Sequence, residues 1–296
     1  MLLLLRRLRL FAFLCFLCCC TLELVAMGVP GTSHSCGDGA LPPTNLAYFD
    51  DMRKLHSNAI VAGVITEGER LAVVLDQTIL HPQGGGQPFD TGSIEAVDGT
   101  IKFCVTDVRT KSGVVYHYGN YHENRVMEAT GFEPGHEVKI SVDGARRTLN
   151  SRLHSAGHLL DACMSNIGLG SLEPGKGYHF PDGPFVEYKG TIPSSDLENK
   201  RDALESEANH LIALGGQVRA TVASYSEAAA LCGGRLPDYI AKESCPRIIC
   251  LGENLGCPCG GTHVLAISEI GEIKVSQIRV RKGVTKVYYN LPKSEA

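Results

Sequence analysis

The chain has 296 residues, of which 44% are hydrophobic and 20% are charged, and its formal net charge is −4 at pH 7. This length and composition are typical of a globular protein with one large or two modest domains and a buried core. The small negative charge excludes attraction of nucleic acid by the overall field, so any RNA contact must come from a local basic patch.

Residues 1–44 are interpreted as a leader and linker outside the fold. Three arginines precede an apolar run at 10–17, and no acidic residue occurs before Glu23. A secretory signal, an organelle transit segment, and a segment omitted when translation begins at Met27 all fit this pattern. The run is too short for a comfortable membrane span, and we expect no stable membrane association of the folded body.

The chain contains 12 cysteines, four of them clustered within residues 15–20. The others are spread through a chain too large to need disulfides, which favours a reducing compartment. We therefore expect a cytoplasmic protein, or a mitochondrial or plastid one if the leader is a transit peptide.

Residues 45–145 are expected to form a domain of short strands. Helical signals are nearly absent, and runs rich in β-branched residues alternate with Gly, Asp and Asn. The pattern predicts a small antiparallel barrel or sandwich. The expected strands are 58–64, 71–75, 93–97, 101–108, 113–118 and 137–142.

Residues 146–293 mix helices and strands. Helical periodicity over 146–167 predicts a first helix. After strand-like segments, a second, charged helix is predicted to end near Leu214, before two glycines. The chain closes with a strand hairpin over 273–291. This half is predicted to be α+β, with helices packed on an antiparallel sheet.

Two pairs of side chains in this half suit a metal ion. His154 and His158 stand four residues apart on a predicted helix and therefore face the same side. Cys259 and His263 have the same spacing, with glycines between them. Two nitrogen ligands from one pair and a sulfur and a nitrogen from the other form a set that suits Zn²⁺. Ser155 stands where a zinc protease would place its glutamate base, which argues against a protease.

A second motif lies in the first half, where Gly84, Gly85, Gly86 and Gln87 follow a predicted strand. Three consecutive glycines permit positive φ and close approach of the backbone to a ligand. No Gly-Lys-Ser/Thr follows, so the segment is not a phosphate loop.

The triple-glycine segment, the His-x3-His helix and the Cys-Gly-Gly-Thr-His segment occur in this order. In this the chain resembles the editing domain of alanyl-tRNA synthetases and, more closely, the free-standing alanyl-tRNA editing proteins of the AlaX type. The resemblance covers about residues 45–291. It implies a small β-barrel followed by an α+β editing domain.

The resemblance also implies a function. Its members bind zinc through residues matching His154, His158, Cys259 and His263, and they hydrolyse the ester of mischarged tRNA(Ala), chiefly Ser-tRNA(Ala) and in some cases Gly-tRNA(Ala). Residues matching Thr78 and Gln87 line the amino-acid pocket, and a threonine hydroxyl suits discrimination of serine from alanine.

His81 departs from this pattern, because an aromatic residue is expected at its position. Nothing resembles the adenylate-forming core of a synthetase, so we expect an editor that acts in trans. Four protein ligands would close a tetrahedral zinc site, which leaves open whether the ion is catalytic or structural. Editing of Ser-tRNA(Thr) and a non-catalytic, zinc-stabilised tRNA-binding module remain alternatives.

Candidate phosphate contacts are Arg146, Arg147, Arg279, Arg281 and Lys282.

Overall fold

A computed structural model of the protein describes residues 41–122 and 131–292, all within one compact unit. The predicted leader and linker lies outside these residues, apart from 41–44. Thr44 is buried, and its hydroxyl donates to the carbonyl of Leu75 at 3.2 Å and accepts from the N–H of Val115 at 3.0 Å. Thr44 is therefore tied to the strands that follow.

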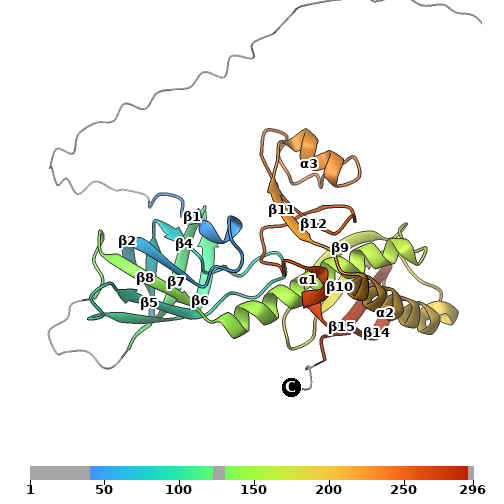
Figure 1. The fold of residues 1–296 in the computed structure, drawn as a ribbon, viewed down its shortest axis with the longest axis horizontal. Coiled ribbons are helices and arrows are strands. Elements are labelled where there is room, and N and C mark those ends of the chain that lie inside the picture. Colours follow the sequence, from blue (N-terminus) through green and yellow to red (C-terminus); the bar gives the residue numbers. More distant parts are fainter. Residues whose placement is uncertain (1–40, 123–130, 293–296) are drawn as a thin grey trace, which may run out of the picture. The chain divides into compact units, whose positions relative to one another are not determined.

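The first half of the unit is a closed antiparallel barrel, which confirms the predicted fold class (Figure 1). Its strands follow one another around the barrel in the order β2, β3, β7, β6, β5, β8, with β8 paired to β2. Their bounds are β2 His56–Glu67, β3 Arg70–Leu75, β5 Gly92–Ala96, β6 Lys102–Lys111, β7 Val114–Tyr121 and β8 Glu137–Val142.

Alternation of side chains explains why these segments form a barrel. In β8, Val138, Ile140 and Val142 are buried, whereas the residues between them face outward. Successive side chains of a strand point to opposite faces, so one apolar set fills the interior. Phe103 and Ile94 complete this core from neighbouring strands.

Two short strands and a helical turn complete the first half. β1 (Asn45–Leu46) pairs in parallel with β4 (Gln77–Thr78), and η1 (Ala47–Phe49) follows β1. The segment that leaves β4 carries the glycines and Gln87.

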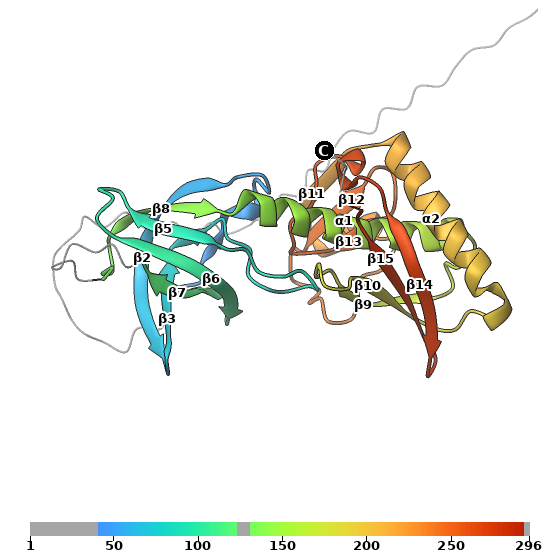
Figure 2. The same cartoon turned by 90° about the horizontal axis from the view of Figure 1, so that it is seen from below.

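Helix α1 (Gly144–Asn166) begins directly after β8, as Figure 2 shows. The Asp143 side chain accepts the N–H of Arg146 at 3.0 Å and so caps the helix. Arg147 is buried, and its Nε donates to the Asp90 carboxylate at 3.0 Å. The prediction that Arg147 contacts phosphate is therefore wrong, because its charge is already paired within the fold.

A four-stranded antiparallel sheet packs against two helices in the second half (Figures 1 and 2). Its strand order is β14, β15, β10, β9, and α2 (Leu197–Leu214) follows η2 (Ser194–Asp196). One face of the sheet contributes Val186, Tyr188 and Tyr289 to a core shared with α1. The strand bounds are β9 Glu173–Tyr178, β10 Phe185–Lys189, β14 Lys274–Arg281 and β15 Val284–Asn290.

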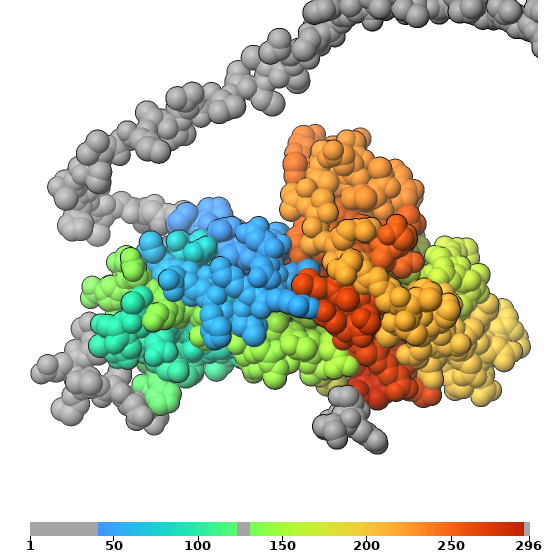
Figure 3. Space-filling model, viewed as in Figure 1, coloured from blue at the N-terminus to red at the C-terminus, as the bar shows by residue number. Residues whose placement is uncertain are grey.

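A smaller sheet forms a segment with its own core. Strands β11 (Val218–Val222), β12 (Arg247–Leu251) and β13 (Cys257–Pro258) are antiparallel, and α3 (Tyr225–Leu231) packs on β12. This segment is the orange projection in the space-filling view (Figure 3). A helical turn, η3 (Ile267–Ile270), connects it to β14. No helix in the described part of the chain is long and apolar enough to cross a membrane.

Candidate metal centre and its pocket

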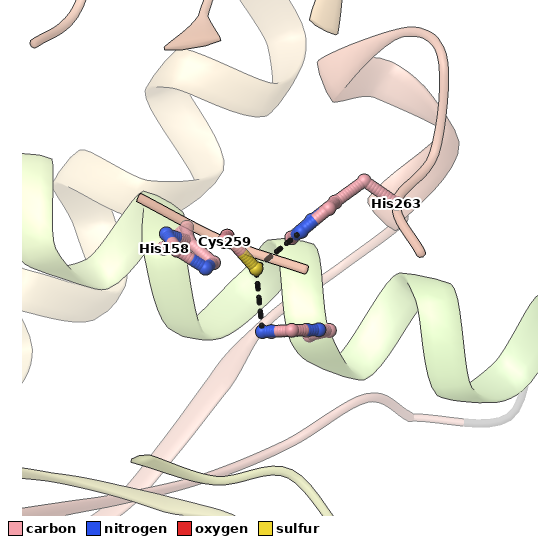
Figure 4. A group of neighbouring side chains, drawn as sticks. His158, Cys259 and His263 are labelled. Carbon is pink, nitrogen blue, oxygen red and sulfur yellow. Dashed lines mark hydrogen bonds between the residues drawn. The ribbon is translucent and has the colours of Figure 1, made fainter. Parts of the chain in front are cut away.

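The structure brings the four predicted metal ligands together. One ligand atom from each of His154, His158, Cys259 and His263 lies within 4.8 Å of the others. Figure 4 shows the Cys259 sulfur between two imidazoles, and its distance is 3.5 Å to Nε2 of His154 and 3.3 Å to Nε2 of His263. The two pairs are over 100 residues apart in the chain, so the fold creates the cluster.

The chemistry and spacing of this cluster fit zinc. Zinc bonds of about 2.0–2.3 Å place tetrahedral ligand atoms roughly 3.3–3.7 Å apart, and the two contacts of Cys259 lie in or near this range. Three imidazoles and one thiolate are the nitrogen and sulfur ligands that zinc prefers. The four residues could therefore hold a metal ion.

Gln87 determines which nitrogen of His154 faces the cluster. Its Oε1 accepts from Nδ1 of His154 at 2.7 Å and from the N–H of Thr262 at 2.9 Å, and its Nε2 donates to Thr262 Oγ1 at 2.9 Å. An amide oxygen cannot donate, so Nδ1 carries the proton and Nε2 keeps its lone pair toward Cys259. This is the type of outer contact that orients metal-binding histidines.

His263 and Cys259 are oriented by neighbours as well. Nδ1 of His263 lies 3.1 Å from the hydroxyl of Ser155, which also accepts the N–H of Val264. The N–H of Gly261 donates to the Cys259 sulfur at 3.3 Å. This hydrogen bond favours the negative thiolate that binds metal.

Burial keeps the histidines of the cluster neutral. It lowers the pKa of His158 to about 4 and holds the pKa values of His154 and His263 well below their usual range, with help from neighbouring imidazoles. Burial raises the pKa of the Cys259 thiol to about 11, against the effects of the Gly261 N–H and Arg247. The imidazoles are therefore ready to bind a cation at neutral pH, whereas the thiol must release a proton to do so.

The cluster lies in the wall of a pocket of about 870 Å³. Segments of both halves of the unit line it: the glycine segment, helix α1, strand β9 and the turn before His263. Its residues include Gly84, Gly85, Gly86, Gln87, His154, His158, Asp161, Lys176, Tyr178, His179, Phe180, Tyr239, Cys259 and Gly260.

The three glycines form a tight turn at the edge of this pocket. The N–H of Gly84 donates to the carbonyl of Gln87 at 3.2 Å, and the N–H of Gln87 donates back at 2.9 Å. Gly85 and Gly86 between them have φ of 56° and 80°, values that glycine adopts readily. The Gly86 carbonyl accepts the N–H of His179 at 2.8 Å, so the turn is joined to the end of β9.

Thr78 is placed differently from Gln87. Its hydroxyl lies 2.8 Å from Nε2 of His117 and accepts the N–H of Leu80 at 3.1 Å, and Thr78 is fully buried. It is not among the residues that line the described pocket. Its hydroxyl is therefore committed to the barrel, and its role in reading an amino acid stays a prediction.

Two further polar residues of the pocket were missed by sequence reasoning. Nδ1 of His179 lies 2.7 Å from the Tyr289 hydroxyl, whose proton goes to the Leu153 carbonyl. Nδ1 must therefore donate, which leaves Nε2 of His179 as an acceptor. Asp161 receives the Tyr188 hydroxyl at 2.6 Å, and burial raises its pKa to about 6. Asp161 stands three residues after His158 on the same helical face, a spacing that could have identified it, whereas no sequence pattern marked His179.

The departure at His81 has a structural role. His81 is buried, its ring lies edge-on to Tyr48 with centroids 5.4 Å apart, and burial lowers its pKa to about 3. A neutral ring in an aromatic contact substitutes here for the aromatic residue expected.

The chain is thus an α+β protein with a closed barrel, and a pocket in it holds three histidines and one cysteine that could bind a metal ion. Comparison with known proteins narrows this description. The family model of class II (A) tRNA synthetases matches residues 44–146. An alanyl-tRNA editing protein, AlaX-L of Pyrococcus horikoshii, is 30% identical over 238 residues, which are 77% of this chain and 53% of that protein.

Alanine–tRNA ligases are similar to the same region. The ligase of Natronomonas pharaonis is 33% identical over 255 residues, 84% of this chain and 26% of the ligase. That of Methanopyrus kandleri is 30% identical over 271 residues, 90% of this chain and 28% of the ligase. The chain thus spans about half the length of the editing protein and about a quarter of the ligases. The comparisons confirm the predicted resemblance to alanyl-tRNA editing proteins of the AlaX type and to a region of alanine–tRNA ligases.

Proposed function

We propose that the protein is a trans-acting deacylase that hydrolyses the ester of mischarged tRNA(Ala), chiefly Ser-tRNA(Ala), with a bound zinc ion. The observation that carries this proposal is the cluster of His154, His158, Cys259 and His263 in a pocket of an AlaX-type chain. The name of the Pyrococcus relative supports the reaction, and the ligand set supports the metal.

The chain's own residues prepare the site for this chemistry. Gln87 and Ser155 fix the rings of His154 and His263, and Gly261 supports the charge of Cys259. A zinc ion held there would supply Lewis acidity for hydrolysis of an ester. The Nε2 acceptor of His179 stands in the same pocket, where it can receive a hydrogen bond from a substrate hydroxyl or amine.

The proposed selectivity for serine follows from a general limit on how well a synthetase can distinguish serine from alanine. A synthetase pocket rejects an added hydroxyl poorly, whereas a second site that hydrogen-bonds the hydroxyl rejects the correct product strongly. A pocket lined by polar side chains suits such a second site. We propose that this pocket accepts the serine ester and disfavours the alanine ester.

The proposal is tested by incubating the purified protein with Ser-tRNA(Ala), Ala-tRNA(Ala) and Ser-tRNA(Thr), each with and without a chelator. We expect rapid release of serine from tRNA(Ala), slow release of alanine, and loss of activity with the chelator. Preference for Ser-tRNA(Thr) would instead indicate threonyl-type editing. Tight tRNA binding with no hydrolysis of any ester would indicate a zinc-stabilised binding module.

A further inference from the structure

The four-stranded sheet has a second face that the core does not use. In β10, Val186 and Tyr188 are buried, so Phe185, Glu187 and Lys189 point to the other side. In β15, Val287 and Tyr289 are buried, so Lys286 and Tyr288 point the same way. We call this side of β9, β10, β15 and β14 the outer face.

Three aromatic side chains form a row across this outer face. Phe185 is the register partner of Tyr178 on one side and of Tyr288 on the other. The rings of Tyr178 and Phe185 are stacked at 5.3 Å, and those of Phe185 and Tyr288 lie 5.5 Å apart. Each of the three residues is only partly buried. We call Tyr178, Phe185 and Tyr288 the aromatic row.

Basic side chains lie beside this row. Lys286 lies over the Phe185 ring at 4.1 Å and pairs with Glu187, and Arg279 lies over the Tyr288 ring at 5.6 Å. Arg281 and Lys282 follow at the hairpin. Within the described part of the chain, Arg279, Arg281 and Lys282 form no ion pair, so their charges are available to an anionic partner.

The aromatic row is continuous with the pocket. Tyr178 lines the pocket and stacks at 4.4 Å on Phe180, which lines it too. His179, between them in the chain, stacks on the His154 ring at 4.7 Å. A flexible polymer lying along the row would therefore lead to the pocket that holds the metal cluster.

Partly exposed rings with neighbouring cations are suited to single-stranded nucleic acid. Every base has a π-face that can stack on an aromatic side chain, and Lys and Arg neutralise the phosphates. Proteins that read unpaired RNA use aromatic residues on the open face of a sheet in this way. The amino acid is attached to the single-stranded 3′ end of a tRNA, so this end is the part that must reach the pocket.

We propose that the outer face binds the single-stranded 3′ end of tRNA, with bases stacked on the aromatic row and phosphates near Lys286, Arg279, Arg281 and Lys282. The inference rests on the proposed function in that tRNA is the partner. It adds the surface and the chemistry of recognition. Stacking on the aromatic row does not depend on which base is present, so binding that comes from stacking alone is independent of the RNA sequence.

The chain provides matched controls on the barrel. Tyr116 is a partly buried tyrosine on an antiparallel strand, its ring is stacked with that of Tyr118 at 6.2 Å, and Lys111 lies over it at 5.0 Å. Lys111 also pairs with Glu67, as Lys286 pairs with Glu187. Tyr116→Ala and Lys111→Ala thus remove the same groups as Tyr288→Ala and Lys286→Ala, but away from the outer face.

The experiment measures binding of two fluorescent RNA hairpins to the full chain by anisotropy. One hairpin ends in single-stranded CCA, and the other is the same duplex cut to a blunt end. We expect the wild type to prefer the overhang. Tyr288→Ala should weaken binding of the overhang hairpin roughly 5- to 100-fold, with little change for the blunt one. Tyr288→Phe should bind like the wild type, because stacking needs the ring and not the hydroxyl.

Lys286→Ala provides a second readout that removes no ring. It should weaken binding of the overhang hairpin and reduce the slope of log affinity against log salt by about 1. Tyr116→Ala and Lys111→Ala should leave both hairpins unaffected. No preference of the wild type for the overhang, or equal binding by Tyr288→Ala and Tyr116→Ala, would overturn the proposal.

The two proposals fail in distinguishable ways. If no ester is hydrolysed but overhang binding depends on Tyr288 and Lys286, the deacylase function is wrong and the binding surface stands. If Ser-tRNA(Ala) is hydrolysed and neither variant changes overhang binding, the function stands and the surface is wrong.

Discussion

At the scale of single residues, the cluster depends on side chains that are not ligands. Gln87 is fully buried and contacts both His154, from α1, and Thr262, from the turn that carries His263. The Thr262 hydroxyl in turn lies 2.8 Å from that of Ser151. One amide thus contacts a histidine of the first ligand pair and the residue next to the histidine of the second pair.

Gln87→Ala should weaken zinc binding roughly 10- to 100-fold, because His154 loses the partner that fixes its tautomer and ring orientation. A competition titration with a chromogenic chelator measures this affinity. Gln83→Ala is the matched control, since Gln83 also lines the pocket but is exposed. Equal zinc affinity of the two variants would show that Gln87 does not position His154.

Thr78→Val should lower the free energy of unfolding by about 1–3 kcal/mol, because Nε2 of His117 and the N–H of Leu80 lose their buried partner. Urea unfolding measures this loss, and Thr78→Ser should restore most of the stability. The predicted recognition role has a separate check on the folded variant. If Thr78 reads the serine hydroxyl, Thr78→Val slows hydrolysis of Ser-tRNA(Ala) relative to Gly-tRNA(Ala), and an unchanged ratio of the two rates argues against it.

His117 should make the barrel sensitive to acid. Burial lowers its pKa to about 4, below the value of about 6.5 for an unfolded chain. Between these values the unfolded state binds more protons, so this contribution to stability is present above pH 6.5 and is lost as pH falls toward 4. From pH 7 to pH 5 the loss should be about 2 kcal/mol.

His117→Asn removes the titrating group, so its free energy of unfolding should fall less between pH 7 and pH 5 than that of the wild type. Urea unfolding of both proteins at the two pH values provides the comparison. Equal losses in the two proteins would mean that His117 contributes nothing to acid sensitivity.

At the scale of elements, much of the fold could be predicted from the sequence because its patterns are local. The alternation in β8 and the helical periodicity of α1 placed both elements to within two residues. The spacing of His154 and His158 predicted their shared face for the same reason. The contacts of Thr78, Arg147 and His179 could not be predicted, because each depends on a partner from a distant strand or loop.

The glycine turn and β9 act as one element of the pocket. A Cβ on Gly86 would lie 2.4 Å from the Gly177 carbonyl oxygen, whereas one on Gly85 would meet nothing within 4 Å. Both glycines have positive φ, so alanine at either position costs about 1–2 kcal/mol in backbone strain.

Gly86→Ala should therefore lower the melting temperature more than Gly85→Ala and should slow deacylation, because the turn must move away from β9. Thermal melting and single-turnover deacylation on the same preparations test this. Equal effects of the two substitutions would show that the close approach at Gly86 does not matter.

At the scale of the whole unit, segments from both halves of the described chain contribute to one site. Gln87 lies after the short strand β4 of the first half, His154 and His158 lie on α1, and Cys259 follows β13. The Arg147–Asp90 pair joins α1 to the segment after Gln87. Binding of a metal at the cluster should therefore stabilise the unit as a whole.

We propose that this cluster is a metal centre at which the ester of mischarged tRNA(Ala) is hydrolysed. The most direct measurement is single-turnover deacylation of Ser-tRNA(Ala) by metal-free protein, as zinc is added back and folding is followed by circular dichroism. We expect folded, metal-free protein to be inactive and activity to return in full at one zinc per chain. Folded, metal-free protein that releases serine at the rate of the zinc-loaded protein would contradict it.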